Sequence, residues 1–334
     1  WPKDIFPLRH EVKIDYQFHQ EPDDYPFIPV KGDGVHEIPV GPVHAGIIEP
    51  GHFRFQVVGE RILRLEERLG YTHKGIAKHF QDVSFDKGAQ LASRICGDST
   101  VAYAWSYNMA LENLHGIHPS PRAQWIRALL LERERIMNHL GDLGALGNDA
   151  GFQFGLNQFS RLKELVLRRN FKLFGHRYLM DSIIPGGVAT DLPPEDTNDL
   201  FEEIRMLRQE VKTLEHIYRE HDGLQDRFLT TGAIDFKLAT ELGLLGLVAR
   251  ASGVSNDWRE DFPCFPYNRL NFKGQTKLSG DVAARVALRF QEIEASLSLM
   301  ETILSSLPRG SLRKNLPAAS STTIGLGCVE GWRG

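Results

Sequence analysis

The sequence predicts a mainly α-helical protein, a bundle of long helices with a small antiparallel sheet near its N-terminal end. Two observations lead to this prediction. Apolar residues recur at three- and four-residue steps through three long segments, as they do on the buried face of an amphipathic helix. Two strand-like runs, residues 52–58 and 61–65, flank Gly59-Glu60, and a Gly-X link between strands is typical of a β-hairpin turn.

The first of the three long helices has a clear start signal. Ser120 can cap a helix, and Pro121 has its φ angle preset for the first helical position. Arg133 falls on the apolar stripe of this helix, and we expect its other Arg and Glu residues on the opposite face. A second helix is expected over residues 194–222, with Gly223 ending it. A third, over residues 281–306, is its expected antiparallel neighbour because both carry a continuous apolar stripe.

Two stretches predict something other than packed helix. The first 40 residues hold six prolines among many charged and aromatic residues, so we expect an extended arm over residues 1–34. The large domain is then expected over residues 35–334. Residues 252–280 are rich in proline and glycine and are expected to form a long loop, of the kind that is usually functional or bound to a partner.

Composition excludes several classes of protein. The chain has 39 Lys and Arg against 43 Asp and Glu, a net charge of −4, whereas nucleic-acid-binding domains are strongly basic. The longest apolar run, residues 242–249, is far shorter than the roughly 20 residues of a membrane-spanning helix. The three cysteines Cys96, Cys264 and Cys328 lie far apart, which argues against a disulfide framework and for a reducing compartment.

Three segments are more specific than their periodicity. They are residues 41–75, the stretch Arg94-Ile95-Cys96-Gly97-Asp98-Ser99, and residues 119–127 with Asn138-His139-Leu140 shortly after. In this order they resemble the large catalytic subunit of membrane-bound nickel–iron hydrogenases, including the formate hydrogenlyase type. They equally resemble the related quinone-site (49-kDa-type) subunit of respiratory complex I.

The resemblance covers about residues 35–334. Residues 1–30 resemble the end of a smaller neighbouring subunit that some members of the family carry fused in front, which makes the arm the expected tail of an upstream domain. The family normally continues past the segment that ends at Gly334, so the domain is expected to be truncated at its C-terminal end.

The resemblance implies a mainly helical subunit of a membrane-associated, energy-converting oxidoreductase. Such a subunit packs against an iron–sulfur subunit, shapes the site where electrons are delivered, and lies on the inner, cytoplasmic face of the cell membrane through its partners. In the hydrogenase branch the site holds nickel and iron on four thiolates, and in the complex I branch it is a quinone pocket with a His and a Tyr. A nicotinamide would bind elsewhere in the complex, because this sequence has no dinucleotide fingerprint.

The chain departs from both patterns of the family. Cys96 occupies the first thiolate position, but Ser99 occupies the second, and a hydroxyl is a poor ligand for a soft metal. A nickel–iron centre is therefore not expected. Ala77 stands where the family has a proton-relaying glutamate, while Ile48 and Gly97 stand at the positions of the quinone-site His and Tyr.

The candidate functional residues are those that remain in or near the motif segments: His44, His73, Arg94, Asp98 and Tyr103. Cys96 is the candidate metal ligand, with Ser99 at the partner position. A quinone is the remaining candidate ligand, and iron–sulfur clusters are expected in a partner subunit.

Each candidate also has a purely structural interpretation. Cys96 can be a small buried residue on a helix, and each histidine can be a structural hydrogen-bonding residue. Arg94 and Asp98 can form an i,i+4 ion pair worth about 0.2–0.5 kcal/mol. Cys264 and Cys328 have no ligand-type neighbours in sequence and are interpreted as structural.

Two functional hypotheses follow, and they leave open whether the chain is itself catalytic. In the first, the chain is a large subunit that shapes a terminal electron-transfer site. In the second, it is a non-catalytic scaffold or assembly paralogue, because Ser99, Ala77, Ile48 and Gly97 replace residues that matter in the family. A free-standing helical enzyme is a third interpretation.

Overall fold

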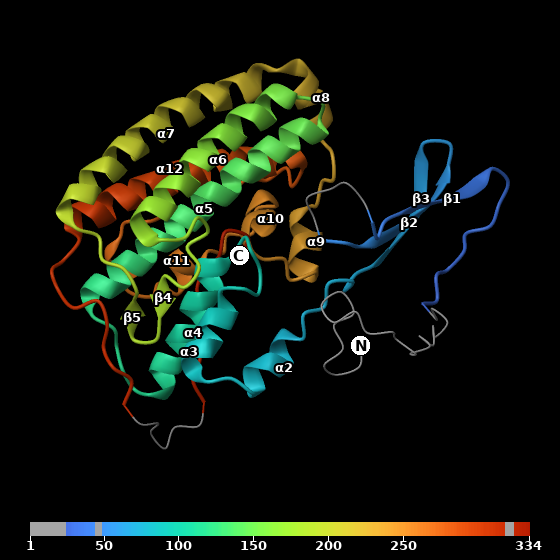
Figure 1. The fold of residues 1–334 in the computed structure, drawn as a ribbon. Helices are drawn as coiled ribbons and strands as arrows, with labels where there is room; N and C mark the ends of the chain where they lie inside the picture. Colours follow the sequence, from blue (N-terminus) through green and yellow to red (C-terminus); the bar gives the residue numbers. More distant parts are fainter. Residues whose placement is uncertain (1–24, 44–48, 318–323) are drawn as a thin grey trace, which may run out of the picture. The chain divides into compact units, whose positions relative to one another are not determined.

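The computed structural model describes residues 25–43, 49–317 and 324–334. The chain divides into two compact units, Trp1–Gly75 and Ile76–Gly334. The first contains a three-stranded antiparallel sheet, and the second is helical with one two-stranded ribbon (Figure 1). The mainly α prediction, with a small sheet near the N-terminal end, is confirmed. Among the described residues, no helix combines the length and apolarity that a bilayer crossing requires.

The sheet is built from β1 (Val35–Val40), β2 (His52–Val58) and β3 (Arg61–Arg68), in the order β1-β2-β3. The predicted hairpin is present, and Gly59 turns it with a φ of +57°, which a residue with a side chain rarely adopts. Strand β1 was not predicted. Residues 25–30 lie against the sheet, since the Gln56 side chain donates to the carbonyl of Ile28 at 3.0 Å. The rest of the predicted arm, residues 1–24, lies outside the described residues.

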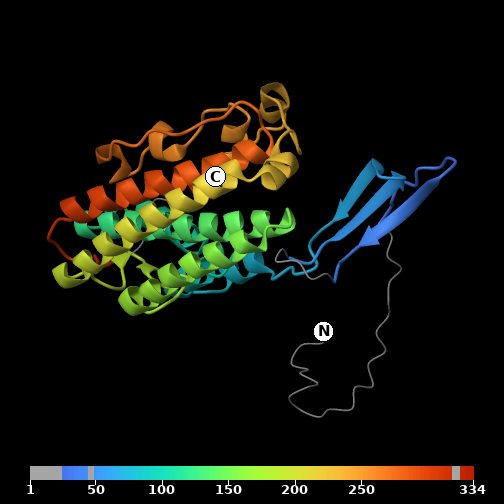
Figure 2. The same ribbon diagram turned by 90° about the horizontal axis from the view of Figure 1, so that it is seen from above.

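Four long helices lie side by side in the larger unit (Figures 1 and 2). They are α5 (Pro121–Asp149), α6 (Gln153–Phe174), α7 (Pro194–Glu220) and α12 (Val282–Ser306). Helix α5 is central, packing on α6 and on α12. Its predicted start is confirmed, because the Ser120 hydroxyl accepts the backbone N–H of Ala123 at 3.1 Å and Pro121 occupies the first turn.

Helices α7 and α12 are neighbours of opposite direction, as predicted (Figure 2). The guanidinium of Arg208 on α7 joins Glu294 at 2.9 Å and Glu301 at 2.8 Å on α12. The predicted stop at Gly223 is wrong. Helix α7 ends at Glu220, and His221 takes an extended conformation whose ring Nδ1 accepts the N–H of Leu224 at 3.2 Å. This cap starts α8, so Gly223 lies inside the next helix.

Shorter elements complete the unit. They are α2 (Ile76–Gln81), α3 (Phe85–Ala92), α4 (Thr100–Leu114), β4 (Ile183–Ile184), β5 (Gly187–Val188), α8 (Asp222–Phe228), α9 (Phe236–Glu241), α10 (Gly246–Ala251), α11 (Trp258–Asp261) and the 3₁₀ turn Tyr267–Arg269. The predicted loop over residues 252–280 therefore contains two short helical turns. It also enters the core, since the Tyr267 side chain is buried.

Four consecutive charged residues, 132–135, lie in the middle of α5 with every side chain buried. Arg133 was expected on the buried face, but the expectation that the other Arg and Glu residues lie opposite it is wrong for Glu132, Glu134 and Arg135. Helix α5 is packed by α4, α6 and α12, so successive side chains at roughly 100° steps meet different neighbours. Each finds a partner of opposite charge or a hydrogen bond there, the condition under which charges are buried.

Candidate functional site

The candidate residues around Cys96 lie in a turn, residues 93–99, that joins α3 to α4. The expectation that Cys96 lies on a helix is wrong, because Gly, Asp and Ser follow it directly and favour turns over helix interiors. The Ser99 N–H donates to the carbonyl of Cys96 at 3.3 Å, and both side chains are half-buried. The hydroxyl of Ser99 does not cap α4.

Glu134 of α5 caps α4 instead. Its carboxylate accepts the N–H of Val101 at 2.5 Å and that of Ala102 at 3.1 Å, and also the Thr100 hydroxyl at 3.1 Å. The side chain is fully buried. Burial raises the pKa of Glu134 to about 7, although the two backbone hydrogen bonds oppose this shift. The turn at residues 93–99 is thereby tied to the core through the first residues of α4.

Arg94 pairs with Asp181 and not with Asp98. Two guanidinium nitrogens lie 2.6 Å from the two Asp181 oxygens, while Ser93 donates to the same carboxylate at 3.4 Å. The predicted i,i+4 pair is wrong because residues 93–99 are not helical, so Arg94 and Asp98 do not share a helix face. Hydrogen bonding from Arg94 lowers the pKa of Asp181, and the pair stays about 40–45% exposed.

Residues 324–334, which we call the strap, lie antiparallel to α4 on the same side as this turn. The Asn113 amide donates to the carbonyl of Leu326 at 2.6 Å, and the Ser106 hydroxyl donates to that of Gly327 at 2.7 Å. Farther along, Gly331 lies beside Ala102. The strap therefore approaches the start of α4 as its residue numbers rise.

Arg333 brings a second guanidinium to the turn. Its Nη2 lies 3.6 Å from a carboxylate oxygen of Asp98, and the two side chains are 67% and 50% exposed. The guanidinium carbon lies 4.2 Å from the centroid of the Trp332 ring, a cation–π distance. Asp98, a candidate site residue, therefore has Arg333 as its described partner and not Arg94.

Beneath the strap lies a buried ionic network, which we define as Glu132, Arg135, His139, Arg250, Asp257, Arg259, Glu292 and Glu330. Arg250 is its hub, with its guanidinium bound to Glu292, 3.0 Å from Glu330 and 3.4 Å from Asp257. Its four carboxylates face three guanidiniums and His139.

Burial opposes ionisation of Glu292, but the hydrogen bond with His139 and the charges of Arg250 and Arg135 outweigh it. The pKa of Glu292 is therefore held well below its usual range. Burial lowers the pKa of His139, whose Nε2 lies 3.0 Å from Glu292. Such a network is stable only while each charge keeps its partners.

The other predicted residues lie elsewhere or cannot be placed. Tyr103 is on α4 one turn after Ser99, with its N–H donating to the Ser99 carbonyl at 3.1 Å, and its side chain is 43% exposed. His73 is exposed in the sheet-containing unit. His44, and Ile48 with it, lies outside the described residues.

The described residues do not fit a nickel–iron centre on four thiolates. At the 93–99 turn they supply one thiol, that of Cys96, and the hydroxyls of Ser93 and Ser99. Burial raises the pKa of the Cys264 thiol to about 11, so that thiol stays protonated at neutral pH. In the part of the chain that the structure describes, no group of three or more His, Cys, Asp or Glu could hold a metal ion.

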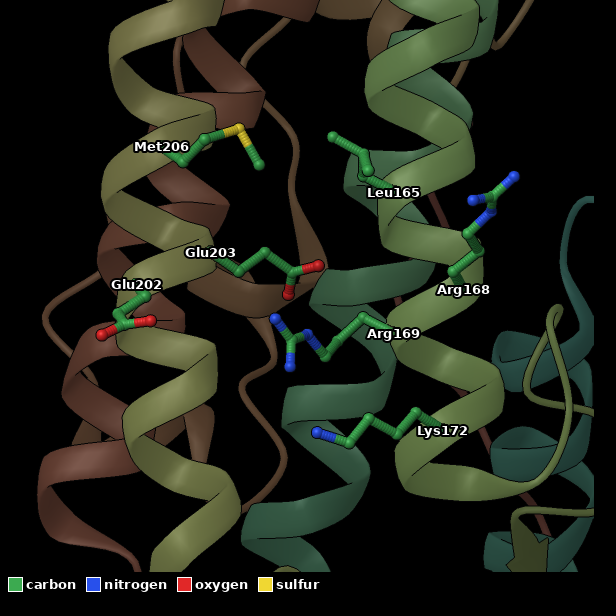
Figure 3. A pocket seen from close by; sticks show the side chains of 7 residues that line it. All are labelled: Leu165, Arg168, Arg169, Lys172, Glu202, Glu203 and Met206. Carbon is green, nitrogen blue, oxygen red and sulfur yellow. The ribbon is translucent and has the colours of Figure 1, made fainter.

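A cleft of about 380 Å³ lies between α6 and α7, away from these residues (Figure 3). Arg169 and Lys172 of α6 point toward α7 across it, Glu203 of α7 points back toward α6, and Arg168 and Glu202 also line it, with Arg168 pointing away from α7. Most of these charges are already paired; Arg169 and Lys172, for instance, share Asp199. The cleft contains none of the predicted site residues.

Sequence reasoning missed Arg333, Glu330 and Glu134. Two signals were present. The four consecutive charged residues 132–135 have apolar residues directly before and after them in the sequence, which is unusual for a solvent-exposed part of a helix. Gly325, Gly327 and Gly331 do not have dinucleotide spacing, but the first two let the strap approach the backbone of α4.

Comparisons with known proteins place this fold. The family model described as "Respiratory-chain NADH dehydrogenase, 49 Kd subunit" matches residues 149–323. Formate hydrogenlyase subunit 5 of Escherichia coli (strain K12) is 32% identical over 93% of this chain and 56% of that protein. The carbon monoxide-induced hydrogenase of Rhodospirillum rubrum is 30% identical over 82% of this chain and 76% of that protein.

A solved structure agrees with these relatives. A chain in the structure of the membrane-bound sulfane sulfur reductase, an archaeal respiratory membrane complex, superposes with a TM-score of 0.84 at 26% identity, over 92% of this chain and 84% of that one. This chain spans little more than half the length of formate hydrogenlyase subunit 5. Together, the family model and these relatives show that the chain belongs to the family of the 49-kDa subunit of the respiratory-chain NADH dehydrogenase.

Proposed function

We propose that this chain is the large subunit of a membrane-associated, energy-converting oxidoreductase, in which it shapes the site where electrons leave a partner's iron–sulfur cluster. The partner subunits hold it on the inner face of the membrane. Family membership supports this proposal, as do relatives named as subunits of membrane-bound hydrogenase and quinone oxidoreductase. A nicotinamide would react elsewhere in the complex.

One observation carries the proposal for this site: the exposed Arg333 guanidinium at the turn that holds Cys96 and Ser99. With a single thiol there, the described residues favour an acceptor over a nickel–iron centre. A guanidinium suits an acceptor atom that gains negative charge, since preorganised donors stabilise developing charge. We therefore propose an acceptor with an electron-rich oxygen or sulfur atom, either a quinone or a sulfane-sulfur compound.

The residues have separate tasks in this proposal. Arg333 donates hydrogen bonds to the acceptor, and Asp98 orients Arg333. Glu134 fixes the first turn of α4, whose N-terminal partial positive charge lies beside the turn. Two electrons from the partner's cluster and two protons from solvent convert a quinone to its quinol, or cleave one S–S bond to two thiols.

The test uses the whole complex, purified from its native host and given a reduced dye as electron donor. Elemental analysis is combined with three assays: reduction of a short-chain quinone, reduction of polysulfide, and evolution of hydrogen. We expect one of the first two acceptors to be reduced, and Arg333→Lys to slow that reduction by about tenfold or more, because lysine lacks the planar fork. Arg219→Lys, an exposed arginine paired with Glu220, is the matched control.

Two outcomes would reject this proposal. Stoichiometric nickel and iron with hydrogen evolution would restore the hydrogenase chemistry. An assembled complex that reduces none of the acceptors would favour the scaffold hypothesis, which the replacements at Ser99 and Ala77 support.

A further inference from the structure

We propose that Glu330 is a positioning residue: held in the buried ionic network, it sets where the strap places Arg333 at the 93–99 turn. This inference deepens the proposed function and rests on it for the role of Arg333 toward the acceptor. The placement of the strap itself does not depend on that function.

The strap packs so closely on α4 that two of its positions have no room for a side chain. A Cβ atom at Gly327 would collide with the carbonyl oxygen of Ser106, and one at Gly325 would collide with that of Ala110. Backbone oxygens inside a helix cannot move aside without breaking their own hydrogen bonds. The line of the strap is therefore fixed up to residue 327.

Glu330 is the anchor that follows this contact with α4. Its carboxylate lies 3.0 Å from Arg250 and accepts the N–H of Trp258 at 3.2 Å. Its carbonyl accepts from Arg135 at 2.7 Å, and the carbonyl of Gly331 accepts from the same guanidinium at 2.8 Å. Both backbone and side chain at this point are thus held by buried groups, and the residue is 6% exposed.

The tether from this anchor to Arg333 is short. Three residue steps reach at most about 11 Å, and the intervening Trp332 is buried, with its ring centroid 5.8 Å from that of His139. The carbonyl of Arg333 passes so close to Gly246 that a Cβ there would collide with it. The backbone of Arg333 therefore follows the anchor.

The side chain of Arg333 is held far less tightly than its backbone. It is 67% exposed, and its described partners are Asp98 at 3.6 Å and the ring of Trp332. Exposed ion pairs of this kind contribute little binding energy, so they cannot restore the guanidinium to its place if the backbone shifts. The anchor at Glu330 therefore sets the position of the Arg333 guanidinium, and Asp98 makes only a small adjustment to that position.

The experiment is a double-variant cycle in the native complex. Glu330→Gln keeps the shape of the side chain and removes its charge. We expect it to lower kcat/KM for the acceptor by about tenfold, because Arg333 acts through its position. The double variant of Glu330→Gln with Arg333→Lys should be no slower than Arg333→Lys alone, because both changes remove the same interaction, that between Arg333 and the acceptor. Effects that multiply would overturn the proposal.

A second variant covers the case in which Glu330→Gln does not assemble. Gly327→Ala displaces the strap from α4 without touching the network, and Gly310→Ala is its control, because a Cβ there meets only Arg122 at an ordinary 3.4 Å. Gly327→Ala should show the same non-additivity with Arg333→Lys, and Gly310→Ala should leave kcat/KM unchanged. A full additional loss in the double variant would again overturn the proposal.

Hydrogen exchange separates this inference from the proposed function. In the assembled complex, Glu330→Gln or Gly327→Ala should speed exchange at the amides of residues 331–334 while leaving those of α6 unchanged. Unchanged exchange in the strap would overturn the positioning role. If exchange changes as expected but Arg333→Lys has no kinetic effect, the proposed function fails and the positioning of the strap stands.

Discussion

The same residue type behaves differently in two regions of this molecule, the buried ionic network and the turn at residues 93–99. Arg250 in the network is 1% exposed and contacts three carboxylates. Arg333 at the turn is 67% exposed and lies 3.6 Å from one. Without water, a buried charge depends on every partner it has. With water, an exposed charge is free to exchange its partner for a ligand, so the network supports the fold and the turn remains available for chemistry.

The largest expected effect breaks the network. Glu292→Gln leaves Arg250, Arg135 and His139 without their shared carboxylate. We expect the free energy of unfolding to fall by about 3–5 kcal/mol, the usual cost of removing one partner from a buried ion pair. Denaturant titration followed by circular dichroism measures this change.

Glu301→Gln on the same helix is the matched control. Its partner is Arg208, at 2.8 Å in a partly exposed pair, and we expect a loss of about 0.2–1 kcal/mol. Similar losses in the two variants would contradict the distinction between the two kinds of charge.

The second prediction concerns pH and the Glu134 cap. Its pKa is raised from 4.5 to about 7 in the folded chain, so between these values the folded state binds the proton that the unfolded state releases. The wild type should therefore lose stability relative to Glu134→Gln as pH rises from 4.5 through 7, by about 3 kcal/mol in total. Above about pH 8 the difference should be constant.

Denaturation midpoints of both forms across this range check the prediction. A difference that stays flat from pH 4.5 to 7 would show that the carboxylate is ionised throughout. The three donors of α4 would then outweigh the burial of Glu134.

The smallest expected effect is at the exposed pair of Arg94 and Asp181. Asp181→Asn removes the charge but suits the backbone, whose φ of +61° is tolerated by Asn as by Asp. We expect a loss of no more than about 1 kcal/mol, since both side chains are partly in water. A loss of stability as large as that of Glu292→Gln, measured the same way, would show that this exposed pair contributes as much as a buried pair of the ionic network.

Helices with local signals could be predicted from the sequence. Ser120-Pro121 starts α5, and the apolar stripes of α7 and α12 make them neighbours, because capping and periodicity depend on residues close in sequence. The helix stop predicted at Gly223 is wrong because His221, two residues before it, caps the start of α8. One residue can end a helix or sit inside the next, and the local pattern does not distinguish the two.

The site was less predictable because its residues come from distant parts of the chain. The motif around Cys96 singles out residues 94–99 but does not give their partners. The partner of Asp98, Arg333, is 235 positions away, and Arg94 meets Asp181 at a separation of 87 residues. No periodicity reports such pairings. Charge usually indicates a solvent-facing position, which predicts Glu132, Glu134 and Arg135 on the outer face, whereas each of these side chains has its partner inside.

The burial of residues 132–135 has a consequence for biosynthesis. Besides Glu132 and Glu292, Arg135 has backbone carbonyl acceptors in a segment 195 residues later, so the centre of α5 cannot be fully dehydrated until that segment has been synthesised. Until then the core of the nascent helix bundle stays hydrated and incompletely packed, a state prone to misassembly. Emergence of the distant acceptors would then act as a completion signal, and chains released before it should be the natural clients of chaperones and proteases.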